Sequence, residues 1–164
     1  MEITIKPASS RKELVEIAAL AARIWHQHYD RLLGTEQVDY MLERYQSEPA
    51  LAAQLAEGYT YLSARDHSGT LVGYCGYHPE GDRLFLSKLY VAKEARGSGI
   101  SRLFLNRLLE AARGMSAIYL TVNKHNESSI AVYRKFGFRT ADAVTTAIGG
   151  GFVMDDYIME LPLR

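Results

Sequence analysis

The sequence predicts an α+β fold of about seven strands and about four helices, within a single domain that spans residues 1–164. Three observations lead to this prediction. The chain is long enough for one domain with a real core and too short for two ordinary ones. Segments with helical periodicity and segments with strand alternation both occur along it. Three alternating segments follow one another directly, separated only by turn sequences, which is typical of an antiparallel meander.

The chain opens with a predicted strand and a long predicted helix. Residues 2–8 alternate between polar and apolar side chains, as a strand does. Residues 12–33 carry apolar side chains at helical spacing. Ser10 and Glu13 have the spacing of a capping box, which would fix the start of this helix.

A helical insert is predicted next. Residues 35–46 and 48–58 have the composition of one or two shorter helices. Pro49 suits the first turn of the second of these, because its missing N–H would have no helical partner there. Gly58 suits the end of the same helix.

The predicted meander follows the insert, in residues 59–66, 70–78 and 82–91. The sequences "HSG" and "PEG" separate these strands and favour tight turns. After a glycine-containing loop, residues 100–113 carry apolar side chains at steps of three and four, with polar side chains on the other face. They predict an amphipathic helix.

The last part of the chain predicts a strand, a helix and a hairpin. Residues 117–122 form a short apolar run typical of a buried strand. Residues 126–137 predict a helix that Gly137 ends. The final two strands flank the sequence "IGGG" at residues 148–151, which favours a turn rather than a domain boundary.

The composition narrows the range of partners. Nineteen basic and nineteen acidic residues cancel, so neither nucleic acid nor an anionic membrane is expected as a partner. We expect a cytoplasmic protein, because no signal region or apolar run of membrane length is found. Cys75, the one cysteine, lies in an apolar segment and is expected to be a buried core residue in a reducing compartment.

The loop before the helix at residue 100 favours an anion site. Gly97 and Gly99 would lie at the N-terminus of that helix, where amide N–H groups lack partners and the helix dipole is positive. Glycines leave these amides accessible to a phosphate, and Arg96 adds a positive charge. The alternative is a loop that only turns the chain, because a short glycine motif alone is weak evidence.

A second strand-to-helix junction changes this balance. The segment "LTVNKHNESSIAVYRKFGF" places Asn126 at the start of a helix, Tyr133 within it and a glycine-aromatic pair after it. The chain here resembles the GNAT superfamily of acyl-coenzyme A-dependent N-acetyltransferases. Its motif A, (R/Q)xxGx(G/A), is matched from Arg96 to Ser101, and its motif B, NxxAxxxY, from Asn126 to Tyr133. The departures are Ser101 and Ser129, both small enough to leave room for a ligand.

The resemblance implies a three-layer fold with a mixed, mostly antiparallel sheet splayed between its fourth and fifth strands. Acetyl-CoA would be the co-substrate, and no metal would be needed. The pyrophosphate of coenzyme A would lie on the loop amides and the pantetheine arm on the fourth strand. Asn126 would cap its helix or bind pantetheine. The implied cofactor-binding residues are Leu89, Tyr90, Val91, Arg96, Gly97, Ser98, Gly99, Ile100, Ser101 and Asn126.

The implied reaction needs a base and is helped by an acid. An alkylamine with a pKa near ~10.4 is almost wholly protonated at neutral pH, so a group must accept its proton. The glutamate that serves in many relatives is missing, since Ser87 and Thr121 stand at the matching positions. Tyr133 is the predicted acid for the leaving thiolate, and a core aromatic residue is its alternative role. The candidate bases, each with an alternative role as an exposed polar residue, are His78, Glu80, Asp82, His125, Asp155 and Asp156.

The acceptor side is expected between the helical insert and the last hairpin. Aromatic residues near Asp155 and Asp156 suit a small cationic amine, such as a polyamine or amino compound. The aromatic residues have an alternative role as core contacts, and His26 and His28 do not form a metal site because their helical spacing points them apart. The candidate substrate-binding residues are Trp25, Tyr29, Ser87, Asp155 and Asp156. The residues of the helical part that are expected on the acceptor side are Trp25, His26, Tyr29, Gln37, Tyr40 and Met41.

The sequence leaves three other interpretations of the function open. The chain could be an inactive acyl-CoA sensor, which the missing glutamates favour and Tyr133 opposes. A protein N-terminus or lysine is the alternative acceptor, and a homodimer is possible in either case. A nucleotide-phosphate enzyme is disfavoured, because Gly97 to Gly99 lacks both the Lys-Ser/Thr of a P-loop and the third glycine of a dinucleotide motif.

Overall fold

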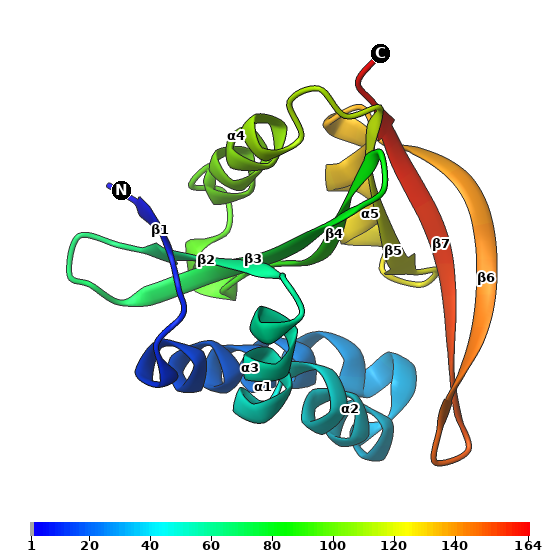
Figure 1. Ribbon diagram of the computed structural model, residues 1–164. Helices are drawn as coiled ribbons and strands as arrows, with labels where there is room; N and C mark the ends of the chain where they lie inside the picture. The colour runs from blue at the N-terminus through cyan, green and yellow to red at the C-terminus, as the bar shows by residue number, and fades with distance from the viewer. Residues whose placement is uncertain (1) are drawn as a thin grey trace.

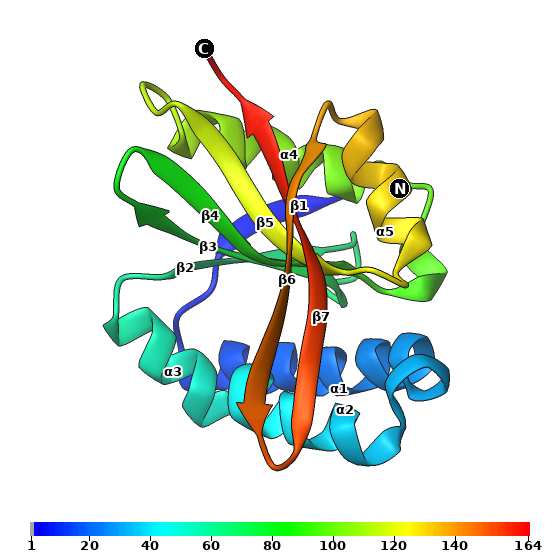
Figure 2. The ribbon, with the colours of Figure 1, turned by 90° about the vertical axis from the view of Figure 1, so that its right-hand side faces the viewer.

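The computed structural model describes residues 2–164, which form a seven-stranded sheet between two layers of helices (Figures 1 and 2). The strands are β1 (Thr4–Pro7), β2 (Thr60–Arg65), β3 (Leu71–Glu80), β4 (Arg83–Val91), β5 (Ala117–Asn123), β6 (Arg139–Gly149) and β7 (Phe152–Pro162). They lie in the order β1-β2-β3-β4-β5-β7-β6, and only β4 and β5 pair in parallel. The predicted α+β fold with a mixed, mostly antiparallel sheet is confirmed.

The helices divide between the two faces of the sheet. They are α1 (Arg11–Leu33), α2 (Thr35–Met41), α3 (Glu48–Ala56), α4 (Ile100–Ala111) and α5 (Glu127–Lys135), with a π-helical turn at Leu42–Gln46 and a 3₁₀ turn at Lys93–Ala95. The first three helices cover one face, and α4 and α5 cover the other (Figures 1 and 2). The insert is therefore two helices joined by a π-helical turn.

The capping residues expected from the sequence define the helix ends. The Ser10 hydroxyl accepts from the Glu13 amide, and the Glu13 carboxylate accepts from the Ser10 amide, so the capping box of α1 is confirmed. Pro49 lies in the first turn of α3. Gly58 and Gly137 both follow helices with φ of 101°, a left-handed conformation that glycine adopts without strain.

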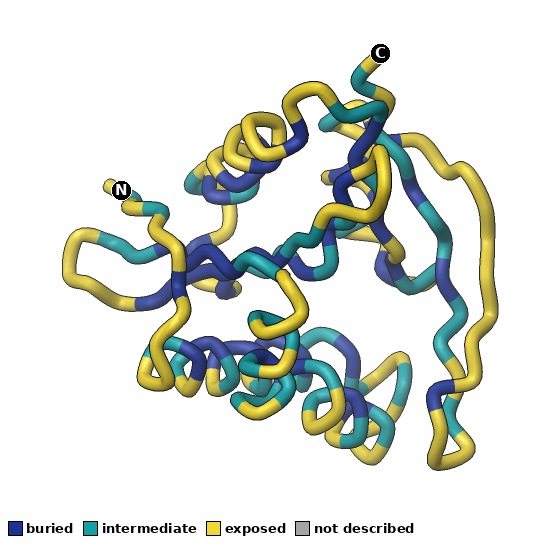
Figure 3. The backbone as a smooth tube through the Cα atoms, in the orientation of Figure 1, coloured by how far each residue is buried: buried dark blue, intermediate teal, exposed yellow. Residues whose placement is uncertain are grey.

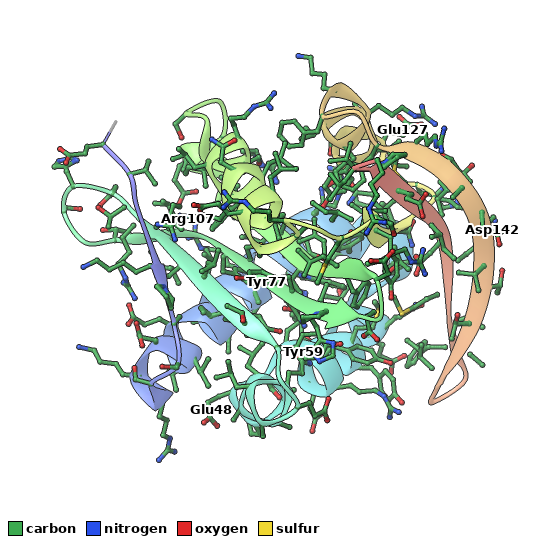
Figure 4. All side chains as sticks on the ribbon, turned by 45° about the horizontal axis from the view of Figure 1, so that its top comes forward. Glu48, Tyr59, Tyr77, Arg107, Glu127 and Asp142 are labelled. Carbon is green, nitrogen blue, oxygen red and sulfur yellow. The ribbon has the colours of Figure 1, made fainter. Side chains whose placement is uncertain are left out.

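The β6–β7 hairpin extends away from the sheet toward α2 (Figure 2). The Gln37 side-chain amide donates to the Val153 carbonyl at 2.9 Å, and the Tyr40 hydroxyl donates to the Ile148 carbonyl at 2.8 Å. Strand β6 is exposed along almost its whole length (Figure 3), and Asp142 lies on this outer edge of the molecule (Figure 4). The hairpin thus joins the end of the sheet to the helical insert.

Candidate active site

The centre of the sheet is split between β4 and β5. Parallel pairing runs from Arg83 and Ala117 to Leu86 and Leu120 and then stops, although both strands continue. Gly76 pairs with Lys88 and Tyr77 pairs with Leu86, so Ser87 is the additional residue of a β-bulge. A bulge bends its strand and increases the local twist, which is consistent with β4 leaving β5 at this point.

Two cavities open on either side of this split. One, of about 450 Å³, is bounded by the loop before α4, and we name it the loop cavity. The other, of about 390 Å³, is bounded by α1, α2, β4 and the β6–β7 hairpin, and we name it the hairpin cavity. Both lie in the size range of small-molecule sites. The residues common to both walls are Tyr29, Leu89, Tyr90, Asn126, Ser129 and Tyr133.

The loop cavity brings together nearly all the residues expected to bind the cofactor. The lining residues include Leu89, Tyr90, Val91, Arg96, Gly97, Gly99, Ile100, Ser101 and Asn126. Ser98 is the exception, because its side chain turns back and donates a hydrogen bond to the carbonyl of Ala95. The first hydrogen bond of α4 runs from the Leu103 amide to the Gly99 carbonyl, so three amides before it have no partner within the helix.

The two loop glycines have a backbone requirement that the motif alone does not reveal. Gly97 and Gly99 have φ of 84° and 82°, a region that costs an ordinary residue about 1–2 kcal/mol. A methyl group built on either glycine would meet no atom within 4 Å. The glycines are therefore needed for the path of the chain, and the space beside them is open. No acidic residue lies in the first turn of α4, so its N-terminus is free to attract an anion.

Asn126 is a buried connection between the two helical layers. Its side-chain oxygen accepts from the Ser129 amide at 3.3 Å, which confirms the predicted cap of α5. The same oxygen lies 2.8 Å from the His28 Nε2 atom, and its amide nitrogen donates to the Tyr29 hydroxyl at 2.8 Å. Because Asn126 has these partners, its side chain is held in place. It also lines the loop cavity, and a role in binding pantetheine stays a prediction.

Tyr133 lies where both cavities meet. It is 9% exposed on α5, and its ring packs against Phe138 with centroids 5.6 Å apart. Burial raises the pKa of its phenol, and the nearby Tyr29 phenol adds to the effect. The side chain packs in the core and lines both cavities, so its role as the acid stays a prediction.

The aromatic residues of α1 also have two roles. Trp25 and Tyr29 are buried in a small apolar cluster, with ring centroids 4.7 Å apart, and both line the hairpin cavity. Burial raises the pKa of Tyr29 to about 12. Gln37 and Met41 also line this cavity, whereas Tyr40 is engaged with the hairpin. His26 does not line it, because its ring bridges Asp30 and Asp39 at 2.8 Å each.

The two aspartates of β7 face opposite ways, because side chains alternate along a strand. Asp155 lies outside the cavity, where it pairs with Lys124 at 2.9 Å and accepts from Thr145 at 3.1 Å. Asp155 does not line the hairpin cavity, so the geometry gives no support for its expected role in substrate binding. Asp156 is 5% exposed and lines the hairpin cavity. Its pKa is raised to about 6, first by burial and then by repulsion from Asp155.

The other candidate bases lie away from both cavities. The His78 ring contacts Glu80 at 3.2 Å and the Glu57 carbonyl at 3.1 Å. Asp82 pairs with Arg164 at 3.2 Å. His125 is exposed in the turn before α5. These side chains have partners at the rim of the sheet or lie in turns. Asp156 is the one candidate base of the six that lines a cavity.

Lys88 is a cavity residue that the sequence reading missed. It is 5% exposed on β4 and lines the hairpin cavity. Its ammonium donates to the Tyr61 hydroxyl at 2.7 Å, to Gln54 Oε1 at 2.9 Å and to Ser87 at 3.3 Å. A signal was present, because Lys88 alternates in phase with the apolar Leu84 and Leu86.

Other groups add no further chemistry to the site. Cys75 is fully buried, as expected, and burial raises the pKa of its thiol, which makes it a poor nucleophile. Within residues 2–164, no cluster of three or more His, Cys, Asp or Glu side chains is arranged to hold a metal ion. No helix in the same range is both long and apolar enough to cross a membrane.

Comparison with known proteins agrees with this geometry. A sequence model described as the acetyltransferase (GNAT) family matches residues 19–138. An uncharacterized N-acetyltransferase of Mycobacterium tuberculosis is 27% identical over 147 residues, which cover 88% of this chain and 94% of that protein. An L-methionine sulfoximine/L-methionine sulfone acetyltransferase of Pseudomonas paraeruginosa is 32% identical over 93 residues, or 52% of this chain and 54% of that protein.

A solved structure shares the fold over the full length. The PaiA N-acetyltransferase from Thermoplasma acidophilum, in complex with coenzyme A, superimposes with a TM-score of 0.83. The alignment covers 99% of both chains at 21% identity. It supports the same arrangement of sheet and helices.

Proposed function

Because the chain belongs to the acetyltransferase (GNAT) family, we propose that it moves an acetyl group from acetyl-CoA to a small primary amine by direct attack in a ternary complex. The observation that carries this proposal is the pair of cavities that meet at Leu89, Tyr90 and Tyr133. A thioester held from one side and an amine held from the other would meet there, next to a candidate acid.

Coenzyme A would occupy the loop cavity. Its pyrophosphate suits the unpartnered amides at the start of α4 and the Arg96 guanidinium, through charge-assisted hydrogen bonds. The pantetheine arm suits the edge of β4 beyond Leu86, where the backbone has lost its β5 partner. An extended arm could add to β4 there by main-chain hydrogen bonds.

The acceptor amine would lie in the hairpin cavity and lose its proton to Asp156. This carboxylate faces the cavity, and its raised pKa makes it a stronger proton acceptor than an exposed aspartate. Transfer is direct or through one water molecule. The neutral nitrogen then attacks the thioester carbon, and the electron pair of the C=O bond moves to the oxygen.

Collapse of the tetrahedral intermediate would break the carbon–sulfur bond. The oxyanion reforms the C=O bond, and the departing thiolate takes a proton from the Tyr133 hydroxyl. The second proton of the nitrogen passes through water to the resulting tyrosinate, and Asp156 releases the first proton to solvent. The Tyr133 phenol is protonated at neutral pH, as an acid must be, and its raised pKa makes it a weaker proton donor than an ordinary tyrosine. A backbone amide near Leu89 is suited to the oxyanion, since such donors need no side chain.

A panel of primary amines, amino acids and peptide N-termini with acetyl-CoA tests the proposal by release of free thiol. We expect turnover with small amines, dependent on both substrates, and mass spectrometry should find the acetyl group on the acceptor nitrogen. Coenzyme A binding without thiol release from any amine would instead support the sensor alternative. Turnover with peptides alone would move the acceptor class to proteins.

A further inference from the structure

The hairpin cavity contains one buried cation with no anion to match it. Lys88 is 5% exposed, and its three contacts are the neutral groups of Gln54, Tyr61 and Ser87. The Tyr61 hydroxyl donates to Gln54, so the group is connected, but no carboxylate lies within ion-pair distance of Lys88 in residues 2–164. Its hydrogen bonds are satisfied, and its charge is not neutralised.

Such an arrangement is costly for the folded protein. Moving an ammonium out of water costs several kcal/mol unless an opposite charge repays it, and buried lysines are rare for that reason. Burial lowers the pKa of Lys88 to about 8, so the side chain still carries its proton at neutral pH. An apolar residue at this position would pack without the cost.

Ser87 makes the cation reachable from the cavity. It is the bulged residue of β4, it lines the hairpin cavity beside Lys88, and its contact with the ammonium, at 3.3 Å, is the longest of the three. An incoming anion could take the place of Ser87 on Lys88 and accept a second hydrogen bond from the Ser87 hydroxyl. The bulge thus presents a donor pair on the cavity wall.

The same cavity carries one acid. Of the residues that line it, Lys88 is the one lysine or arginine and Asp156 is the one carboxylate, with no histidine among them. The remaining titratable lining groups are the tyrosines Tyr29, Tyr45, Tyr59, Tyr90 and Tyr133. Asp156 makes no hydrogen bond with the described residues through its side chain. The cavity therefore has two ionisable groups of opposite sign, on β4 and β7, that do not pair with each other.

We propose that Lys88 and Ser87 bind a carboxylate of the acceptor, so that the acceptor is an amino acid whose ammonium group faces Asp156. This inference rests on the proposed function and narrows its acceptor class. It replaces the cationic amine expected from the sequence, because a polyamine would bring a second positive charge toward Lys88. It also disfavours a peptide N-terminus, whose neighbouring carboxyl is an uncharged amide.

Pairs of amino acids and their amides test the carboxylate directly, because the two differ in charge and hardly in size. Straight-chain amino acids from glycine to 6-aminohexanoate, each beside its amide, would be assayed with acetyl-CoA by thiol release. We expect wild-type kcat/KM to favour the best acid over its amide by about 10- to 100-fold, the usual worth of a hydrogen bond to a charged group. The preferred chain length then measures the separation of the two charged groups.

Lys88→Met keeps the length of the side chain and removes the charge. In this variant the acid-to-amide ratio should fall toward one, and Ser87→Ala should lower it by a smaller factor. Wild-type enzyme that uses amides as well as acids would overturn the inference while the transfer function stands. A preference that persists in Lys88→Met would also overturn it. Ser87→Ala keeps the test available if Lys88→Met does not fold.

Failure of the transfer function gives a different result. If no amine releases thiol, calorimetry of the same acids and amides with coenzyme A-saturated protein tests the carboxylate site without turnover. Binding of the amino acid but not of its amide, with that binding lost in Lys88→Met, supports the carboxylate site. Equal binding of acid and amide, or binding of neither, overturns it.

Discussion

The two cavities are built by different means, although they share the wall at β4. In the loop cavity, the expected anion site is one continuous segment, Arg96 to Ser101, defined by backbone amides and glycine conformations, while side chains from α1, β4 and α5 complete the wall. The hairpin cavity is assembled from side chains on elements far apart in the chain, namely α1, α2, α3, β4, β5, α5, β6 and β7. It also buries Lys88 and Asp156, two charges with no ion-pair partner within residues 2–164.

This difference separates a general function from a specific one. Backbone amides can bind any pyrophosphate, so the same loop can serve many acetyltransferases without change. Side chains from distant segments can be replaced one at a time, so the hairpin cavity can be fitted to one acceptor. The buried charges should cost stability, and that cost is a measurable sign of a site kept for function.

The largest expected effect is on kcat, from a substitution of Tyr133 in the wall that the two cavities share. Tyr133→Phe keeps the ring and removes the acid, so kcat should fall by about 10²- to 10⁴-fold, while coenzyme A affinity and the melting temperature change little. Steady-state kinetics and thermal melting on the same preparation measure this. Tyr77→Phe is the matched control, because Tyr77 (labelled in Figure 4) lines neither cavity. Near-wild-type kcat, with chemistry shown to be rate-limiting, would assign Tyr133 a packing role.

The next effect should appear only in the loop cavity. Gly99→Glu places a carboxylate at the N-terminus of α4, so the Kd for coenzyme A should rise by about 100-fold or more as two charge-assisted hydrogen bonds are lost. Gly99→Ala is the control, since it carries the same strain at a φ of 82° without the charge. Calorimetry measures both. Equal affinities in the two folded variants would place the pyrophosphate elsewhere.

A substitution of Asp156 in the hairpin cavity should also lower kcat, and it should change how kcat depends on pH. Asp156→Asn should lower kcat by about 100-fold, and the wild-type rise of kcat with pH near about 6 should disappear, because a protonated carboxyl cannot accept the amine proton. Asp155→Asn, on the outer face of the same strand, should keep the rise but move it to lower pH, because repulsion from Asp155 is one cause of the raised pKa of Asp156. A pH–rate profile that keeps its rise in Asp156→Asn would exclude Asp156 as the base.

The same variant should be more stable at neutral pH. The folded-state pKa of Asp156, about 6, is above its ordinary value of 3.8. The protonated carboxyl therefore favours the folded state at low pH, and this contribution is lost as the pH rises through about 6. Asp156→Asn should melt about 2 °C or more above wild type at pH 8 and close to it at pH 4. A lower melting temperature at pH 8 would contradict the raised pKa.

Lys88 should show a stability effect with the opposite dependence on pH, and its size should be reduced because the hydrogen bonds of Lys88 to Tyr61 and Gln54 are lost together with the charge. Its folded-state pKa of about 8 is below its ordinary value of 10.5, so the wild type gains stability as the pH rises from about 8 toward 10.5. Lys88→Met should remove this gain and melt no lower than wild type at pH 7. Lys12→Met, at an exposed position of α1, should leave the pH dependence unchanged. Melting temperatures from pH 6 to 10 test both variants.

The sequence predicted the loop cavity better than the hairpin cavity for a physical reason. A site made of backbone amides needs a short continuous segment with glycines at set positions. The segment from Arg96 to Ser101 has this pattern in the sequence itself. The helix ends were equally local, as Ser10 and Asn126 demonstrate. The directions of Asp155 and Asp156 depended on the register of β7 against its neighbours, which only the folded sheet fixes.

The sequence did not predict Lys88 as a cavity residue, because a lysine is ordinarily exposed. Its burial depends on Gln54 and Tyr61, which are 34 and 27 residues away along the chain. The expected separation of β4 from β5 was correct, and it came from the resemblance to a family rather than from residue spacing. The phase of Lys88 with Leu84 and Leu86 indicated burial, but no local pattern shows which distant residues would surround its ammonium.

Direct transfer across β4 is the central claim, and the mass of the intact protein tests it most directly. Wild-type protein would be incubated with acetyl-CoA alone, weighed, and then supplied with an amino acid acceptor. Direct transfer predicts a protein of unchanged mass, followed by acetylation of the acceptor only when both substrates are present. A protein that gains one acetyl group and passes it to the acceptor after acetyl-CoA is removed would contradict the account, because it would show a covalent intermediate in place of a ternary complex.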